Sequence, residues 1–273
     1  METEELATLI FNRLIQKKEQ LKLDYKESSS NIGYFFIDDL LPIEIAAQIN
    51  TVFPKKESMV LKKSIGEFKH VAAQMDKYHP LLEKVIFAFQ DERIVNVVGE
   101  ICGIKSLEPD ENLYAGGISL MAEGNFLNPH LDNSHDKERD KWRVLNLLYY
   151  VSPDWKEEYG GHLEIWPNGL KNDPIVIQSK FNRLAVMATH QNSWHSVSTV
   201  TFNKERCCIS NYYFSNNPLK EDDAFHITSF RGRPGEKVKN MILYFDSNLR
   251  MAVRRVFKKG IRENPHLYKK NKN

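Results

Sequence analysis

Two histidines and one aspartate in this sequence have the residue types and the spacing of a metal-binding set. His130 and Asp132 stand two residues apart, and His195 follows 63 residues after Asp132. Because alternate residues of a β-strand point to the same side, an imidazole and a carboxylate at this spacing can face one ion. Two imidazoles and one carboxylate that leave further coordination positions open form the facial ligand set of non-haem iron(II) oxygenases. A His-x-Asp pair alone is unspecific, so the prediction depends on the residues that accompany it.

An arginine at the start of an apolar run is the second chemical feature. Arg206 comes eleven residues after His195 and is followed by two cysteines, an isoleucine and Ser210. If this run is a strand, Arg206 and Ser210 share one face with Tyr212. A buried arginine is costly unless it meets a carboxylate. Two partners stay open at this point: an internal aspartate or glutamate, and the carboxylate of a bound ligand.

The periodicity of apolar residues predicts the elements that position these side chains. Helical spacing predicts helices within the first twenty residues and over 43–49, 81–89 and 92–101, with a short strand over 32–37. After Pro109 the period changes, and turn signals separate predicted strands over 113–121, 142–151, 162–166, 174–177, 184–187, 195–201 and 207–214. Seven short strands at this pace favour a β-sandwich or barrel over βαβ units.

Together these elements predict one α+β domain over residues 1–273. A helical lead-in covers 1–108, a β-rich core covers 109–216, and a tail covers 217–273. Within the tail, a helical pattern begins after Pro234 and continues to Val256. A chain of this length buries roughly three quarters of its unfolded surface on folding, so its core does not need disulfide bonds for stability.

Composition excludes several classes of protein. The chain is 41% hydrophobic and 27% charged, which excludes disorder, and its formal charge of +2 gives no reason to expect nucleic acid or a membrane surface as partner. Its three cysteines cannot form a disulfide framework. The first five residues are acidic where a signal peptide is basic, and no run approaches the ~18 apolar residues of a membrane span. We therefore expect a cytoplasmic protein.

The order of the chemical residues resembles a known family. His130-x-Asp132, His195 and Arg206-x-x-x-Ser210 are similar to the pattern of the iron(II)- and 2-oxoglutarate-dependent dioxygenases. The prolyl-hydroxylase-like branch is the most similar, because its strand-loop-strand signature resembles the segments 147–155 and 160–167. The resemblance runs from about residue 113 to 215 and does not extend to the tail.

This resemblance implies a fold, a cofactor set and a reaction. The fold is a double-stranded β-helix, or jelly roll, whose metal ligands are His130, Asp132 and His195. The cofactors are Fe(II), 2-oxoglutarate as cosubstrate and O2, with ascorbate as an accessory reductant. The reaction is hydroxylation of an unactivated C–H bond in a small molecule or a peptidyl residue, with release of succinate and CO2.

The resemblance also implies a binding site for 2-oxoglutarate. Arg206 binds its distal carboxylate with help from Ser210 and Tyr150, and Leu148 and Leu163 pack on its chain. In a strand, Leu148 and Tyr150 share a face with residue 146, which agrees with these roles.

Side chains near the predicted ligands are candidates for substrate binding: Asn128, Asn133, His135, Arg143, Trp166, Trp194 and Tyr212. Two other functions remain open. One is a jelly-roll binding protein without catalytic activity. The other is a cupin-type metal enzyme that does not use 2-oxoglutarate, in which Arg206 has no assigned role.

Overall fold

Antiparallel strand pairing organises the chain. The computed structural model describes residues 1–257 and 267–269. Ten strands follow one another across the sheet in the order β1-β10-β7-β12-β5-β3-β6-β11-β8-β9. Their bounds are β1 Tyr34–Ile37, β10 Arg183–Ala188, β7 Trp142–Tyr150, β12 Arg206–Ser215, β5 Gly117–Met121, β3 Glu67–Ala72, β6 Phe126–Leu131, β11 His195–Val197, β8 Leu163–Ile165 and β9 Ile175–Ile177. Three short strands flank this path: β2 Val60–Lys63 pairs with β3, β4 Leu107–Pro109 with β12, and β13 Ser229–Phe230 with β6.

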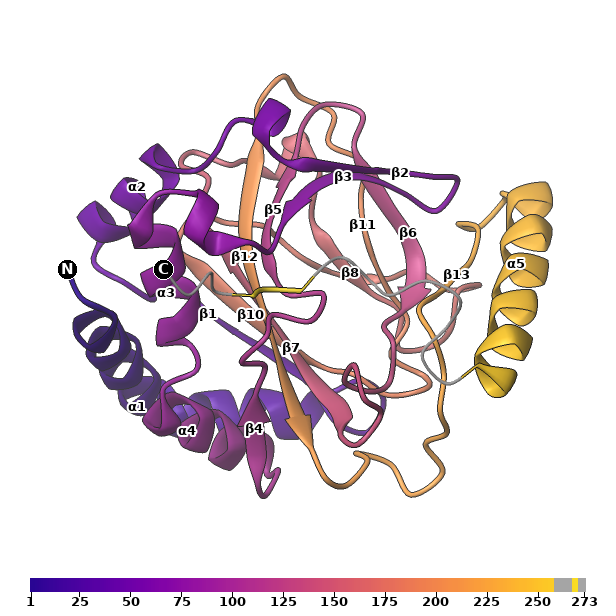
Figure 1. The fold of residues 1–273 in the computed structure, drawn as a ribbon, viewed down its shortest axis with the longest axis horizontal. Helices are drawn as coiled ribbons and strands as arrows, with labels where there is room; N and C mark the ends of the chain where they lie inside the picture. The colour runs from indigo at the N-terminus through magenta and orange to yellow at the C-terminus, as the bar shows by residue number, and fades with distance from the viewer. Residues whose placement is uncertain (258–266, 270–273) are drawn as a thin grey trace.

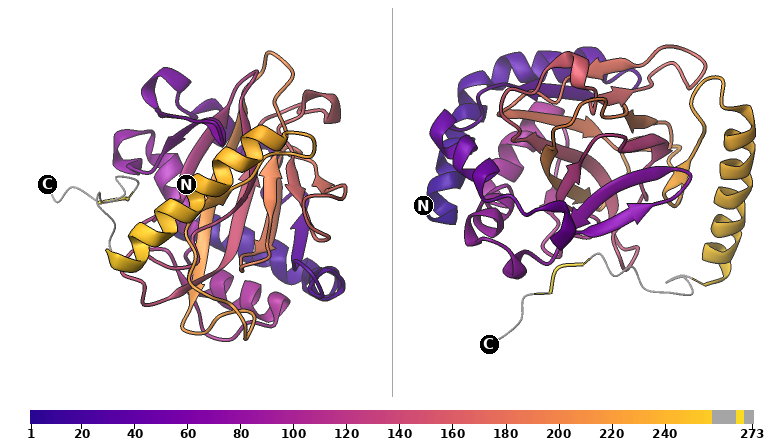
Figure 2. Two further views of the ribbon diagram at one scale, coloured as in Figure 1. Left: turned by 90° about the vertical axis from the view of Figure 1, so that its right-hand side faces the viewer. Right: turned by 90° about the horizontal axis from the view of Figure 1, so that it is seen from above.

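Four helices cover the outer face of the half of the sheet that contains β1, β10, β7 and β12, and a fifth lies on the opposite side of the molecule (Figure 1). They are α1 Thr3–Ser28, α2 Ile43–Thr51, α3 Pro80–Ala88, α4 Glu92–Cys102 and, opposite, α5 Lys237–Val256. The sheet curls so that β6, β11 and β8 face β7 and β12 across the interior (Figures 1 and 2). This is the predicted α+β jelly roll with helices at both ends of the chain.

In the central strand β7, the side chains of one face pack in the core and those of the other face line the site. Its outward residues Leu145, Leu147 and Tyr149 are at most 1% exposed and belong to the core formed with the helices. Burying a side chain of this size contributes about 1.5–3 kcal/mol. The alternate residues Asn146 and Leu148 point to the inner face and line a cavity. The strand therefore fixes its register through the outer face and presents its inner face to the site.

The structure corrects parts of the predicted element pattern. The lead-in over 1–108 is not only helical, because the hairpin β2–β3 joins the sheet between β5 and β6. Its strands lack a clean alternation of buried and exposed residues, which hid them in the sequence. The strand predicted from residue 113 begins only at Gly117, because Leu113 and Ala115 adopt positive φ angles in the preceding loop. The helix predicted up to Val256 is present as α5, and the part of the tail at 258–266 and 270–273 lies outside the described residues.

Candidate active site

Strand pairing brings the three predicted metal ligands together. His195, the first residue of β11, stands directly opposite His130 near the end of β6, and Asp132 follows β6 by one residue. Nε2 of His130 lies 3.7 Å from Oδ1 of Asp132, and Nε2 of His195 lies 3.6 Å from Oδ2. All three ligand atoms lie within 4.8 Å of one another, and all three side chains are buried. Two nitrogens and one carboxylate on one side of a potential ion leave the opposite side open for other ligands.

Hydrogen bonds fix the orientation of both imidazoles. Nδ1 of His130 donates to the Asn128 carbonyl oxygen at 3.0 Å, and Nδ1 of His195 donates to the Ser193 carbonyl oxygen at 2.9 Å. Because a carbonyl oxygen can only accept, each ring carries its proton on Nδ1 and turns the lone pair of Nε2 toward Asp132. Burial, reinforced by the neighbouring His195, lowers the pKa of His130 to about 3, so this ring stays neutral. Nδ2 of Asn146 donates to Oδ2 of Asp132 at 3.3 Å and orients the carboxylate. The donor set therefore fits a divalent cation.

A cavity of about 90 Å³ leads from these three residues to Arg206. Leu148 of β7 and Leu163 of β8 form apolar parts of its wall, and Ser210 of β12 lies on the same wall as Arg206. The alternation predicted for β12 is present, because Arg206, Ser210 and Tyr212 all line this cavity.

Arg206 is buried without a carboxylate partner. Arg206 is 4% exposed, and no aspartate or glutamate among the described residues forms an ion pair with it. One Nη contacts the Met121 sulfur at 3.3 Å, the guanidinium lies 5.3 Å from the centre of the Tyr150 ring, and Nε has no hydrogen-bond partner. The Tyr150 hydroxyl beside it is also buried and has no hydrogen-bond partner in the part of the chain that the structure describes. Of the two partners that the sequence left open, the internal carboxylate is therefore not found among the described residues.

Backbone conformation creates the room for this arginine. Gly160 and Gly161 both adopt positive φ angles, 66° and 68°. A Cβ atom at Gly161 would come within 3.1 Å of Cδ of Arg206 and within 3.0 Å of the Val200 side chain. A Cβ atom at Gly160 would lie only 2.0 Å from the Thr199 carbonyl oxygen. Both positions therefore require glycine, for conformation and for close approach.

A second cavity, of about 160 Å³, adjoins the metal ligands from the side of the β2–β3 hairpin and β13. It shares His130, Asp132 and Tyr212 with the first cavity, so the two spaces meet at the ligand cluster. Residues that sequence analysis missed contribute to its wall: Lys62, Glu67, Lys69, Thr228 and Phe230. The turn at 64–66, which ends in glycine, is the one signal that could have revealed the hairpin. Phe230 gave no signal, and it stacks on the His130 ring at 5.1 Å only because β13 pairs with β6.

A β-bulge directs Arg143 into this second cavity. On β7, Leu145 stands opposite Tyr213, but Arg143 stands opposite the next residue, Phe214, so Val144 is an extra residue in the ladder. Val144 and Leu145 both pack in the outer core, and Arg143 turns to the inner face. Bulges beside active sites commonly redirect a side chain in this way. Without the bulge, Arg143 would share the outer face of Leu145.

Arg143 is 2% exposed and keeps free hydrogen-bonding capacity. One of its Nη atoms donates to the Tyr114 carbonyl oxygen at 3.0 Å, and the guanidinium stacks 4.0 Å from the centre of the Tyr212 ring. Its Nε has no hydrogen-bond partner. Of the seven predicted substrate-binding residues, Arg143 and Tyr212 are the two that line the cavities at the ligand cluster.

The other five predicted substrate-binding residues are engaged elsewhere. Asn128 orients His130 through its carbonyl oxygen, and the Asn133 side chain donates to the His135 carbonyl oxygen. The His135 ring packs on Trp142 and Phe225. The Trp166 indole donates to Ser196, and Trp194 lies beside Arg231. None of the five lines either of the two cavities.

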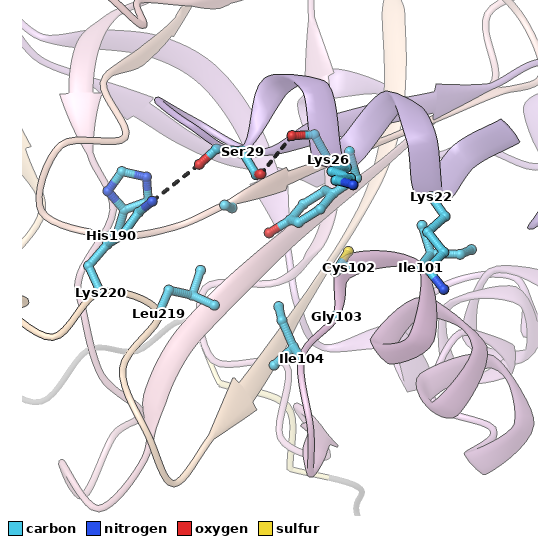
Figure 3. A pocket seen from close by; sticks show the side chains of 13 residues that line it. Lys22, Lys26, Ser29, Ile101, Cys102, Gly103, Ile104, His190, Leu219 and Lys220 are labelled. Atoms are coloured by element: carbon cyan, nitrogen blue, oxygen red, sulfur yellow. Dashed lines mark hydrogen bonds between the residues drawn. The ribbon is translucent and has the colours of Figure 1, made fainter. Parts of the chain in front are cut away.

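A separate cavity of about 400 Å³ lies on the outer face, where α1 and α4 end (Figure 3). Three lysines surround it. Lys220 donates to the Ser29 carbonyl oxygen, and the Ser29 hydroxyl donates to the Lys26 carbonyl oxygen. These contacts satisfy carbonyl groups at the C-terminus of α1, a common role for cations there. None of the predicted ligand or cosubstrate residues lines this cavity.

Comparison with known proteins finds a family model and solved structures that are similar to this chain. Residues 116–214, which include the ligand cluster and Arg206, match the model of the 2OG-Fe(II) oxygenase superfamily. A prolyl 4-hydroxylase from Phytophthora capsici is 18% identical with a TM-score of 0.57, covering 93% of this chain and 80% of that one. A prolyl-4-hydroxylase from Pseudomonas putida is 14% identical with a TM-score of 0.53, covering 71% and 97%. A 2OG-Fe(II) oxygenase family oxidoreductase from Burkholderia pseudomallei is 15% identical with a TM-score of 0.50, covering 76% and 94%. At these identities the likeness to solved structures shows the fold.

Proposed function

We propose that this protein is a 2OG-Fe(II) oxygenase that hydroxylates an unactivated C–H bond of a small molecule or a peptidyl residue, which the match of residues 116–214 to the model of that superfamily supports. In this reaction one O2 and one 2-oxoglutarate are consumed for each C–H bond that becomes C–OH. Succinate and CO2 are the other products. Ascorbate would serve only to keep the iron reduced.

One observation carries this proposal: Arg206, buried and without a carboxylate partner among the described residues, lines the same cavity as the ligand cluster. A buried guanidinium is stabilised by an anion, and its planar set of N–H donors can form two parallel hydrogen bonds to a carboxylate. The neighbouring Tyr150 and Ser210 hydroxyls can donate to the same carboxylate. A cupin-type enzyme that does not use 2-oxoglutarate leaves this cation without a role, and a binding protein without catalytic activity leaves the neighbouring metal-ligand set without one.

We assign the metal to His130, Asp132 and His195, which fit iron(II) as two neutral imidazoles and one carboxylate. When bound, the iron supplies the redox chemistry that couples decarboxylation of 2-oxoglutarate to hydroxylation. The surrounding residues hold these ligands ready: two backbone carbonyls fix the imidazoles, and Asn146 fixes the carboxylate. Leu148 and Leu163 exclude water along the cosubstrate chain, which strengthens its interaction with Arg206.

We further propose that the substrate enters through the second cavity and contacts Arg143 and Tyr212. Three cations, Lys62, Lys69 and Arg143, line this cavity together with two carboxylates, Glu67 and the proposed metal ligand Asp132. Glu67 lies 3.5 Å from Lys69, which leaves a positive excess. This excess supports an anionic substrate, such as a small carboxylic acid or an acidic peptide. Prolyl peptides should be tested beside these anionic candidates, because two of the similar structures are prolyl 4-hydroxylases.

The experiment that tests the function measures succinate formed from 2-oxoglutarate under air with Fe(II) and ascorbate. Candidate anionic small molecules and peptides are added, and products are examined by mass for the gain of one oxygen atom. We expect turnover that requires O2 and is lost in His195→Ala. A protein that binds the metal but neither binds nor consumes 2-oxoglutarate would instead be a cupin-type enzyme or a binding protein.

We propose the cytoplasm as its location. Cys102, Cys207 and Cys208 are buried free thiols, as expected in a reducing compartment. None of the helices in the described residues is long and apolar enough to cross a membrane.

A further inference from the structure

Helix α5 packs on the protein through its polar side. Leu243 and Ser247, 6% and 5% exposed, face the body of the protein. On the same side, Arg250 donates to the Thr228 carbonyl oxygen at 3.1 Å, and Arg139 donates to the Arg254 carbonyl oxygen at 3.0 Å. Residues 243, 247, 250 and 254 form one stripe at helical spacing, so the inward face of α5 is defined by contacts.

The opposite side of α5 is apolar and open. Val238, Phe245, Leu249 and Val256 are 65–75% exposed, Ile242 is 46% exposed, and Ala252 is exposed. These six residues, which we call the α5 seam, are separated by 4, 3, 4, 3 and 4 positions. α5 lies diagonally across the face of the molecule opposite α1–α4 (Figures 1 and 2). A helix that turns its polar side inward and a continuous apolar stripe outward has the pattern of a helix with a missing partner.

We propose that the partner is the α5 helix of a second copy of this chain, and that the two helices pair as an antiparallel coiled coil. Alternating steps of three and four residues over the whole helix are the heptad pattern of a helix–helix seam. In the antiparallel register centred on residue 247, Val238 faces Val256 of the second copy, Ile242 faces Ala252, and Phe245 faces Leu249. All six positions then have an apolar partner, and one two-fold axis relates the two copies. The antiparallel arrangement also opposes the two helix dipoles.

The apolar area of the seam is sufficient for a dimer. An apolar side chain of this size exposes on the order of 100–200 Å² when fully open. At the exposures given above, the seam and the flanking Met241, 54% exposed, offer roughly 500–700 Å² from each copy. The pair would bury about 1,000–1,400 Å², which reaches the size of a specific interface.

Part of the positive charge of α5 is not available to a lipid surface. A helix that binds an anionic membrane needs free basic side chains beside its apolar face. Here Lys239 pairs with Glu236, and Arg250 pairs with Asp246 and with the Thr228 carbonyl oxygen. Two of the five cations of α5 are thus engaged within the chain, whereas Lys237 and Arg255 are exposed, so anionic vesicles are one arm of the test below.

Dimerisation would also brace one wall of the substrate cavity. α5 contacts β13, whose Phe230 stands opposite His130 and stacks on its ring. Arg231, the next residue, lies 4.7 Å from the centre of the Tyr244 ring of α5. The pairing of two α5 helices would therefore hold β13 in place beside the ligand cluster.

The first test is the mass of the protein in solution by sedimentation velocity from 1 to 100 µM. We expect the wild type to reach twice its chain mass of 31.8 kDa at the upper concentrations. Leu249→Glu should shift the dissociation constant upward by at least ~100-fold, because it places two charges in the seam. Leu23→Glu is the matched control, since Leu23 is a 54% exposed leucine of α1. Circular dichroism checks that both variants remain folded.

A second test addresses the orientation of the helices. Chains with Ile242→Cys and Ala252→Cys, one of them size-tagged, are mixed and oxidised; the three natural cysteines are buried. The antiparallel register predicts that the mixed disulfide dominates, whereas a parallel pair would give Ile242→Cys homodimers and overturn the orientation. A wild type that stays monomeric at 100 µM, or a dimer that Leu249→Glu leaves intact, would overturn the proposal itself. Sedimentation of the monomer with phosphatidylserine vesicles, lost in Leu249→Glu, would replace the second copy by a membrane surface.

Discussion

Replacing Arg206 by methionine should separate cosubstrate binding from protein stability. Methionine keeps most of the apolar stem that packs near Met121 and the Tyr150 ring, but it removes the charge. Because 2-oxoglutarate would leave its carboxylate buried and unpaired in this variant, its binding should weaken by about 3–5 kcal/mol. At 1.4 kcal/mol for each factor of ten, the dissociation constant rises roughly 100- to 4,000-fold. Arg206→Lys should recover part of this loss, since an ammonium group cannot reproduce the planar fork.

The same substitution should not destabilise the protein without cosubstrate. Arg206 has no carboxylate partner among the described residues, so no internal ion pair is broken when its charge is removed. Replacing a buried charge by an apolar side chain of similar size is often neutral or stabilising, by ~1–4 kcal/mol. If Arg206 instead belonged to a structural ion pair, the free energy of unfolding would fall by about 3–5 kcal/mol.

Two measurements decide between these outcomes. Calorimetric titration of 2-oxoglutarate into the Mn(II)-loaded protein gives the affinity, and urea unfolding of the protein without cosubstrate gives the stability. Lys204→Met is the control, because it removes an exposed cation two residues away. Equal affinity for 2-oxoglutarate in Arg206→Met and wild type would refute the assignment of this carboxylate site. Unchanged affinity with a large loss of stability would identify Arg206 as a structural residue.

Three further predictions follow from the site and its surroundings. His195→Ala should weaken binding of Fe(II) or Mn(II) by at least ~100-fold, because losing even a residue that only hydrogen-bonds to a metal ligand costs 10–100-fold in affinity. His79→Ala, which removes an exposed histidine, is the control. Equal metal affinity of the two variants would contradict the ligand set. Tyr150→Phe removes a buried hydroxyl that has no hydrogen-bond partner among the described residues, so 2-oxoglutarate affinity should fall about 10- to 100-fold while stability without cosubstrate is maintained; an unchanged affinity in the titration would exclude the contact. Asp110→Asn should stabilise the protein at high pH: burial raises the pKa of Asp110 from 3.8 to about 6, so the folded state binds more protons than the unfolded state between these values. The contribution of Asp110 to stability is therefore full below pH ~4 and falls as pH rises to 6 and above, and the gain of Asp110→Asn should grow to about 2–3 kcal/mol at pH 8 in urea unfolding. A gain that is constant from pH 4 to 8 would contradict the shift.

The sequence singled out side chains that the fold brings together, but it missed some of the elements that position them. The spacing of His130 and Asp132, with His195 and Arg206 further along, indicated a ligand set and an anion partner, because these depend on side-chain type and on the two-residue period of a strand. The alternation in β12 likewise placed Arg206, Ser210 and Tyr212 on one face, as observed. The helices α1, α3 and α4 were predictable because each has an apolar face at helical spacing.

Only the tertiary structure decided how the site opens to its substrate. The β2–β3 hairpin is half-exposed on both faces, so its sequence shows no period, and its place between β5 and β6 depends on long-range pairing. The bulge at Val144 reverses the side to which Arg143 points, and no local pattern marks an extra residue in a ladder. No carboxylate of the described residues lies beside Arg206, and this depends on every segment that packs around it. The apolar pattern of α5 was visible in the sequence, but its outward direction was not, because periodicity defines a face without saying what that face meets.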